Sequence, residues 1–528
     1  MGTVMTSYYA RVPSSRKQTL TLVATIVASA MTFIDTTVVN VALPALQREL
    51  GATITDVQWV VEAYALFLGA LILVGGSLGD QFGRKRIFLL GIVWFTAGSI
   101  WCGVASSPRF LIIGRGLQGI GAAFLVPGSL AIISATFDGT ERGRAIGTWS
   151  GFSAITTAVG PVIGGWLIEH VSWRWSFFIN VPLAVVVVLL SLRYMDESRD
   201  PSRSGRIDWI GALLAVAGLG GIVLGLLEWP PLGPGHPLVI GSLVAGITCL
   251  GLLVFAEHKE KSPMMPLHLF ASRSFSLANL LTLLLYGALG VVFFLVPLLL
   301  IQVKGYSATA AGAAFLPLPI LMFVLSRWSG GLVARTGARL PLSVGPAIAA
   351  AGLALFARVG FEDSYWATVF PAVVILGFGM AITVAPLTTT VMSAVPSDHA
   401  GVASGINNTV ARVAGLLAIA VFGVVLARRF EARIQPVINQ SWITPEVRAQ
   451  IDKELPKMAG AQFDQLHLDP LRRSVLEGAV RESFLSGFRL VVIEAAVLAL
   501  VGAGFGAGVA DESTRKAARS GSMSGAAQ

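Results

Sequence analysis

The chain has 528 residues, of which 54% are hydrophobic and only 13% charged, whereas ordinary soluble domains have about 25% charged residues. Its 58 glycines fit helices packed in lipid, where small residues let backbones approach closely, so the composition indicates a membrane protein with many spans. The net charge of +9 does not indicate nucleic-acid binding, because Lys and Arg are dispersed through short connectors. Cys102 and Cys249 each lie within an apolar run, which excludes a disulfide framework and a cysteine metal site.

Apolar runs long enough to cross a bilayer recur along the whole chain. Segments that reach about twenty mainly apolar residues, the length of a membrane-spanning helix, lie at 19–43, 57–79, 86–106, 109–134, 146–168, 175–194, 208–228, 237–256, 275–302, 310–334, 341–359, 366–392, 402–427 and 486–509. The sequence therefore predicts an all-α polytopic membrane protein with 14 transmembrane helices.

The charged connectors predict how the chain is oriented. An even number of spans places both termini on one side, and the connectors of that side carry most of the Lys and Arg. The positive-inside rule then predicts an inner-membrane protein with both termini cytoplasmic. The first apolar run is too long for a cleavable signal peptide. Residues 1–18 are expected to be a cytoplasmic segment, and 511–528, rich in Ser, Gly and Ala, a disordered cytoplasmic tail.

An internal repeat relates the two halves of the sequence. The repeated features, at offsets of about 254 to 259 residues, are Gly76 to Gly83 with Gly330 to Gly337, Pro127 with Pro386, and Ala145 to Gly147 with Ala403 to Gly405. Many secondary transporters build a central site from repeated halves. We therefore expect a six-helix bundle at 19–194, two extra helices with linkers at 195–274 and a second six-helix bundle at 275–510.

The segment 428–485 within the second bundle is polar and is predicted to be an outer loop. Pro445 and Pro470 each follow a capping residue, so we expect each to begin a short amphipathic helix. A spacer over the outer face is the simplest interpretation of this loop.

Asp35, Glu62 and Arg115 lie inside predicted spans, where charged side chains are costly and usually face a cavity or a partner. At a rise of about 1.5 Å per residue all three fall roughly 8 to 12 Å inside the outward boundary. Two carboxylates and an arginine in one partly dry layer can hold or release a proton as water access changes, which predicts a proton-coupling site. The alternative is a structural ion-pair cluster that locks three helices together.

Two further constellations lie near the ends of spans. The residues predicted to form a conformational latch between spans two and three are Gly76, Asp80, Gly83, Arg84 and Arg86. There Asp80 can pair with a nearby Arg or accept amides at a helix N-terminus, and a substrate site is the less favoured alternative. The small surfaces and helix distortion expected at a close helix crossing in span five come from Gly160, Pro161, Gly164 and Gly165; packing alone is the alternative.

Polar and aromatic side chains elsewhere in the spans are candidates for lining a central cavity, although an aromatic stripe at helical spacing is more often packing. These candidates are Asn40, Gln118, Asn279, Tyr286, Phe293, Asn407 and Arg412. The sequence has no Walker-type loop, no His or Cys metal cluster and no nucleophile elbow. We therefore expect neither an enzyme nor a metal or cofactor.

Several motifs resemble one known group, the fourteen-span drug:proton antiporter branch of the major facilitator superfamily. The motifs that carry the resemblance are Asp35 to Pro44, Gly76 to Arg86, Leu111 to Gly121, Gly151 to Gly165, and Trp173 to Trp175 with Phe178 to Pro182. The resemblance implies that Asp35 is a proton or cation site, that Arg115 is linked to proton transfer and that Gly151 to Gly165 is the antiporter motif. Glu62 lies outside these motifs, and Ala334 replaces the acid in the second copy of the loop.

The sequence thus predicts a multidrug exporter that moves small lipophilic or cationic compounds against protons by alternating access, surrounded by membrane lipid. A dedicated exporter of a lipid, siderophore or metabolite in the same fold is the first alternative, and a non-transporting membrane sensor is the second. A membrane enzyme is disfavoured because no catalytic constellation is present. The sequence does not indicate whether a periplasmic adaptor is engaged.

Overall fold

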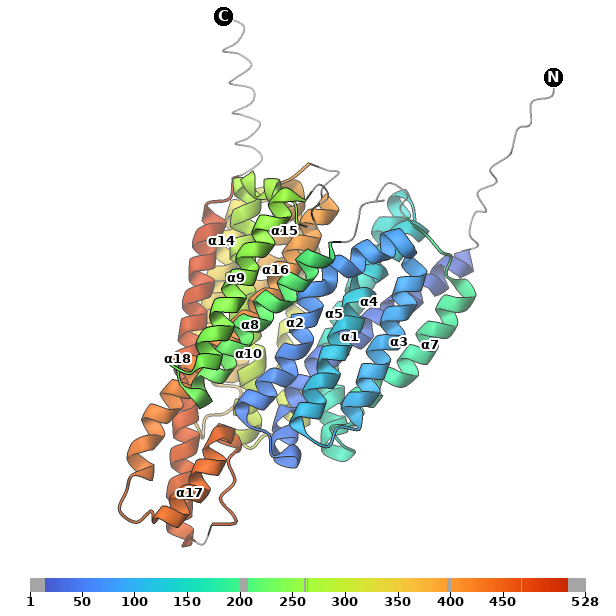
Figure 1. Cartoon of the computed structure of the whole chain (residues 1–528). Helices are drawn as coiled ribbons and strands as arrows, with labels where there is room; N and C mark the ends of the chain where they lie inside the picture. Colours follow the sequence, from blue (N-terminus) through green and yellow to red (C-terminus); the bar gives the residue numbers. More distant parts are fainter. Residues whose placement is uncertain are drawn as a thin grey trace, which may run out of the picture.

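The computed structural model of the chain describes residues 15–199, 208–260, 263, 265–396, 400–466 and 468–510. Within these residues the fold is helical and contains no strand, and 14 helices are long and apolar enough to cross a membrane (Figure 1). The predicted fold class is therefore confirmed. The first helix begins at Ser15, so residues 15–18 are helical, while the predicted tail at 511–528 lies outside the described residues.

The first half of the chain forms one bundle. Its helices are α1 (Ser15–Leu50), α2 (Ile54–Phe82), α3 (Arg84–Gly103), α4 (Pro108–Thr136), α5 (Gly139–His170), α6 (Trp175–Phe178) and α7 (Asn180–Tyr194). Local sequence sets the helix starts: Thr53 and Asp56 form a capping box at α2, and Ser107 caps α4 ahead of Pro108. Glycine lets α2 and α4 touch, because a methyl group on Gly119 would lie 3.2 Å from Cα of Tyr64.

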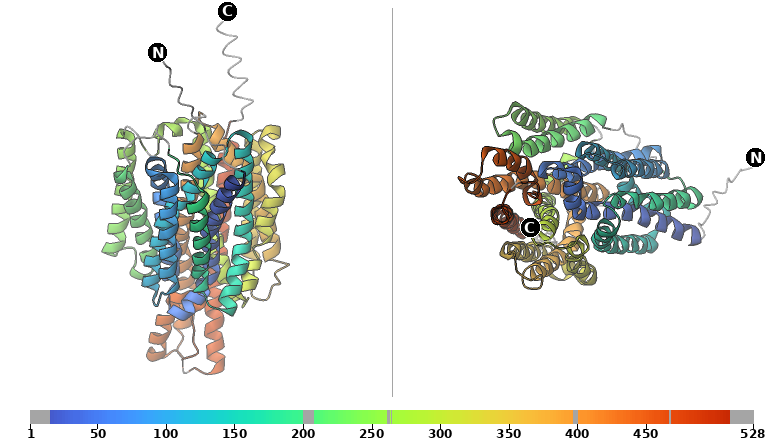
Figure 2. Two further views of the ribbon diagram at one scale, coloured as in Figure 1. Left: turned by 90° about the vertical axis from the view of Figure 1, so that its right-hand side faces the viewer. Right: turned by 90° about the horizontal axis from the view of Figure 1, so that it is seen from below.

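Helices α8 (Trp209–Leu232) and α9 (Pro237–Lys259) form a closely packed pair beside the two bundles (Figure 2). A methyl group on Gly246 would lie 2.7 Å from the backbone nitrogen of Ile222, so these backbones are nearly in contact. The pair packs through α8 against α2 and α16, one helix from each half. Leu213 and Ile247 expose 69% and 64% of their surface, as expected of helices that face lipid.

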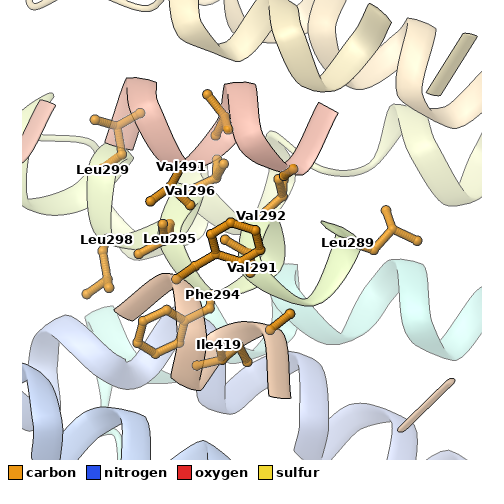
Figure 3. Packing of buried hydrophobic residues seen from close by; sticks show 14 of the residues in the cluster. Leu289, Val291, Val292, Phe294, Leu295, Val296, Leu298, Leu299, Ile419 and Val491 are labelled. Atoms are coloured by element: carbon orange, nitrogen blue, oxygen red, sulfur yellow. The ribbon is translucent and has the colours of Figure 1, made fainter. Parts of the chain in front are cut away.

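The second half forms the other bundle. Its elements are η1 (Leu267–Ala271), α10 (Arg273–Leu298), η2 (Leu299–Val303), α11 (Ala308–Ala313), α12 (Pro317–Gly330), α13 (Leu332–Thr336), α14 (Arg339–Leu355), η3 (Phe356–Arg358), α15 (Val369–Ser393), α16 (Ala400–Ile438), α17 (Pro445–Glu454), η5 (Leu455–Gly460) and α18 (Pro470–Ala507). Its core is built on α10, where Phe294 and Leu295 are buried together with Ile419 of α16 and Val491 of α18 (Figure 3).

The structure refines one prediction about this half and corrects another. A candidate span is found at Ala308–Leu325, where 310–334 was predicted, but the helix there is interrupted into α11, α12 and α13, and Pro317 begins the middle piece. The helix predicted to be short from Pro470 is the start of α18, which continues through the last span for 38 residues. Leu476, Val480 and Phe484 are buried at a four-residue spacing, so the apolar face of the last span continues along the first turns of α18. The charged residues between them led the sequence analysis to assign this segment to a loop.

The long helices α16 and α18 extend beyond the other spans and carry a small folded cap, defined as residues 439–469 and described except for 467 (Figure 1). At a rise of about 1.5 Å per residue the 38 residues of α18 span about 57 Å, well beyond a hydrocarbon core of about 30 Å. Ile451, Met458 and Phe463 of the cap are buried. We call this end of the bundle the cap end; α1 begins and α18 ends at the opposite end, the termini end.

Candidate transport and coupling site

A fully buried ion pair joins α1 to α4. Arg115 Nη1 donates to Asp35 Oδ2 at 2.5 Å, and the two residues are 1% and 0% exposed. Arg115 Nε also donates to the carbonyl of Val60 on α2, at 3.0 Å. The pair therefore ties three helices of the first half together, and removing either charge would leave the other buried without a counter-ion.

Neutral polar side chains complete this site, and sequence analysis identified only part of them. Gln118 Nε2 donates to Asp35 Oδ1 at 2.9 Å and to Ser99 Oγ at 2.7 Å, and Gln118 Oε1 accepts from Arg115 at 2.8 Å. Asn180 Nδ2 donates to Asp35 Oδ1 at 3.4 Å and to Ser99 at 3.2 Å. Gln118 thus belongs to a buried network rather than to an open surface. Asn180 lies within one of the motifs above, whereas nothing in the sequence marks Ser99.

Glu62 does not join this network. It is 0% exposed on α2, and neither of its carboxylate oxygens has a hydrogen-bond partner among the described residues. The sequence placed Glu62 in the same layer as Asp35 and Arg115; within the described residues it is a buried acid that makes no hydrogen bond to that pair. Tyr64, also on α2, packs its ring against the guanidinium of Arg115, 4.3 Å from ring centroid to Cζ.

The candidates for cavity lining fall into different surroundings. Asn407 Nδ2 donates to Asn279 Oδ1 at 3.1 Å and to Thr282 Oγ1 at 2.7 Å, so these residues join α16 to α10 within the second half. Phe293 packs against Phe315 with ring centroids 5.3 Å apart. The remaining candidates, Asn40, Tyr286 and Arg412, are all partly exposed.

The predicted latch lies at the termini end of α2 and α3. Arg84 Nε and Nη2 donate to Asp80 Oδ1 at 3.0 and 2.9 Å. Gly76 faces α4, where a methyl group would lie 3.7 Å from Cβ of Pro127. Gly76, Asp80 and Arg84 of the loop motif therefore make contacts within the first half.

The second part of the latch is held by the segment after α7. The carboxylate of Glu197 accepts from the backbone of Lys85 at 3.0 Å and lies 3.8 Å from Arg86 Nε. Gly83 has a φ of +116°, and a methyl group there would lie 2.6 Å from Cδ of Glu197. Glycine is needed for both the backbone conformation and the approach of the carboxylate to the N-terminus of α3.

The glycines of α5 make contacts with both halves at the cap end. Gly160 packs on Thr37 and Gly164 on Val38, both in α1. On the opposite side a methyl group on Gly165 would lie 2.6 Å from Cα of Thr309 in α11. Gly312 of α11 packs in turn on the carbonyl of Pro161. The small residues of α5 therefore let α5 of the first half pack closely against α11 of the second.

Hydrogen bonds reinforce this contact between the halves. Gln302 Nε2 of η2 donates to Gln47 Oε1 of α1 at 2.7 Å, and Gln47 Nε2 donates to the carbonyl of Lys457 in the cap at 3.3 Å. Elsewhere at this end Thr309 Oγ1 donates to Glu169 Oε2 at 2.7 Å. The cap end is therefore closed in this structure.

Two six-helix halves, a buried carboxylate–arginine network within the first of them and a helix pair added at their edge define an integral membrane protein of the secondary-transporter class. Comparison with known families agrees with this class. The family model of the Major Facilitator Superfamily matches residues 25–419, and the chain belongs to this family.

Characterised relatives and solved structures are similar over nearly the whole chain. "Multidrug resistance protein Stp" of Mycobacterium tuberculosis is 34% identical over 92% of this chain and 91% of its own. "Tetracenomycin C resistance and export protein" of Streptomyces glaucescens is 32% identical over 92% and 90%. A crystal structure of a bacterial homologue of the human lysosomal transporter Spinster, inward-facing and unoccupied, has a TM-score of 0.62 at 17% identity and covers 93% of this chain and 98% of that one. That likeness concerns the fold.

Proposed function

We propose that this protein exports small lipophilic compounds of the drug type by exchange with protons, through alternating access of the two halves. Support comes from the relatives, whose names describe multidrug resistance and tetracenomycin export. The observation that carries the proposal is the buried Asp35–Arg115 pair, because a titratable carboxylate in the middle of a span is costly and usually marks a transport or proton pathway.

Proton binding at Asp35 changes the forces in the first half. As a carboxylate Asp35 accepts from Arg115, Gln118 and Asn180. A proton on this carboxyl removes the charge that balances Arg115 and occupies one acceptor site, so the network that ties α1 to α4 must loosen. Protonation and the packing of the halves are thereby linked.

Glu62 provides a second step in this scheme. A buried carboxylate without a partner is strongly disfavoured, whereas the protonated acid is tolerated. Glu62 can therefore release its proton only after helix movement brings water or a cation to it. In this proposal Asp35 binds the proton and Glu62 changes its affinity for the site. A change in the charge of Asp35 reaches α2 through Arg115, which donates to the carbonyl of Val60.

The remaining motifs would set the two end states. The glycines of α5 seal the cap end, and the Asp80–Arg84 loop with Glu197 serves as the latch at the termini end. Lys17, Lys85 and Arg86 lie at the termini end, so the positive-inside rule assigns that end to the cytoplasm of a cell whose inner membrane holds the protein.

The test is dye counterflow by the purified protein in proteoliposomes under an imposed proton gradient, with Asp35→Asn as the test variant. Asp138→Asn is the matched control, because that carboxylate is fully exposed at the start of α5. We expect gradient-driven flux in the parent and in Asp138→Asn, and loss of its pH dependence in Asp35→Asn. Absence of gradient-driven flux in the parent, or an unchanged pH profile in Asp35→Asn, would overturn the proposal.

A further inference from the structure

We propose that the substrates of this transporter carry an acidic group and that Arg412 binds it at the contact between the two halves. The proposal rests on the proposed export function and adds the chemical class of the compound. It adds an acidic class of substrate to the lipophilic or cationic compounds that the sequence favoured.

Arg412 lies where one half meets the other. Helix α16 of the second half runs along α2 of the first: a methyl group on Gly69 would lie 3.8 Å from Cβ of Arg412, and one on Gly405 would lie 3.4 Å from Leu73. Arg412 retains partial exposure although α2, α8, α10 and α18 pack around its helix. Asn408, one turn away on the same face, is exposed. This face of α16 is therefore both central and accessible.

The guanidinium of Arg412 makes no hydrogen bond or ion pair within the described part of the chain, unlike Arg115, which is held by Asp35, Gln118 and the carbonyl of Val60. A lone guanidinium in the middle of a spanning helix is expensive and is usually matched by a partner at some stage of the cycle. Arg412 is therefore a cation in need of an anion.

The neighbouring helices offer no anion to it in this state. Asp35 is occupied by three donors, and its charge is balanced by Arg115. Glu62 lies seven residues from Gly69 along α2, about 10 Å by helical rise, and has no partner. Glu494 of α18 makes no ion pair with Arg412 either. An anionic molecule that enters between the halves can therefore pair with the guanidinium of Arg412.

The chemistry of the side chain defines that molecule. A guanidinium presents a planar fork of donors that matches a carboxylate, sulfonate or phosphate group, and Asn408 can donate to the same group. A permanent cation would instead be repelled. Tyr64 lies on α2, the helix of the first half against which α16 packs, and its ring packs against the guanidinium of Arg115, 4.3 Å from ring centroid to Cζ. A shift of α2 when an acidic compound binds would therefore reach the Asp35–Arg115 pair.

The experiment compares three probes with one fluorophore: pyrenebutyrate, its neutral amide and a pyrene-bearing quaternary ammonium of similar length. Their dissociation constants are measured on purified protein without a gradient, for the parent, Arg412→Gln, Arg412→Lys and the control Arg428→Gln, which changes an exposed residue of the same helix. We expect the parent and Arg428→Gln to bind the carboxylate at least tenfold more tightly than the amide. Arg412→Gln should lose this preference while still binding the amide, and Arg412→Lys should keep part of it.

Equal binding of the amide or the ammonium by the parent would overturn the proposal, as would a preference that survives in Arg412→Gln. A uniform loss of all three probes in both Arg412 variants would also overturn it, because that pattern indicates an internal partner such as Glu62. Counterflow with the same probes separates the two proposals: a carboxylate preference without gradient-driven flux refutes export alone, and flux without the preference refutes the acidic substrate class alone.

Discussion

Replacing Asp35 by Asn tests whether the buried pair is coupled in energy as well as in geometry. The substitution leaves Arg115 with its charge in surroundings where it is 1% exposed, and breaking a buried pair from one side costs about 3 to 5 kcal/mol. Removing both charges, in Asp35→Asn with Arg115→Gln, takes away the stranded cation. We therefore expect the double variant to recover at least about half of the stability that Asp35→Asn loses.

The assay is thermal unfolding of the purified variants in detergent, run as a double-mutant cycle with proton-driven flux measured in parallel. The double variant should recover at least about half of the loss in unfolding temperature but not its pH-dependent flux, because the titratable group is absent. A double variant as unstable as the sum of the two single variants would refute the coupling. Recovery of flux together with stability would mean that the pair is a structural lock and not a proton site.

Three further predictions follow from the same contacts. In Gly165→Ala the added methyl group would clash with the backbone of α11, which should weaken the cap-end closure by about 1 to 3 kcal/mol and slow flux. Gly147→Ala in the same helix meets open space and should not slow flux. Equal rates in the two variants would contradict the proposed seal. Glu62→Gln should flatten the limb of the pH–flux profile that depends on releasing the second proton, and an unaltered profile would reduce Glu62 to a structural residue. A backbone amide and the Thr444 hydroxyl lower the pKa of Glu446 at the start of α17, so its stabilisation of the cap is present above the usual carboxyl range and is lost as pH falls through the lowered value. The protection factors of amides 445–454, which correct for the intrinsic pH dependence of exchange, should then fall on acidification more in the parent than in Glu446→Gln, and identical profiles would refute this role.

The sequence predicted the number of spans and the buried acid well because both follow from local patterns. Asp35 and Arg115 stand out as charges within apolar runs, and no other signal is needed to select them. The cap was harder to predict: α18 reads as a polar loop followed by a span, because the charged face of its first turns hides a continuous apolar stripe.

Pairings between distant residues were beyond the sequence. Gln302 bonds Gln47 across 255 positions, and Ser99 joins the Asp35 network only because α3 and α4 pack closely there. Arg412 was visible as a charge, but its lack of a partner became evident only once the helices around it were placed. Likewise, the depth argument put Glu62 in the same layer as Asp35, but it could not show that Glu62 stays outside the hydrogen-bond network around Asp35.

The central claim is that substrate binding and proton binding are linked through Asp35. Calorimetric titration of a transported substrate in two buffers of different ionisation enthalpy measures that linkage directly, because released protons add the buffer's heat to the signal. We predict that the parent releases protons when substrate binds and that Asp35→Asn releases fewer at the same pH. A binding enthalpy that is identical in both buffers for the parent would contradict proton exchange at this site.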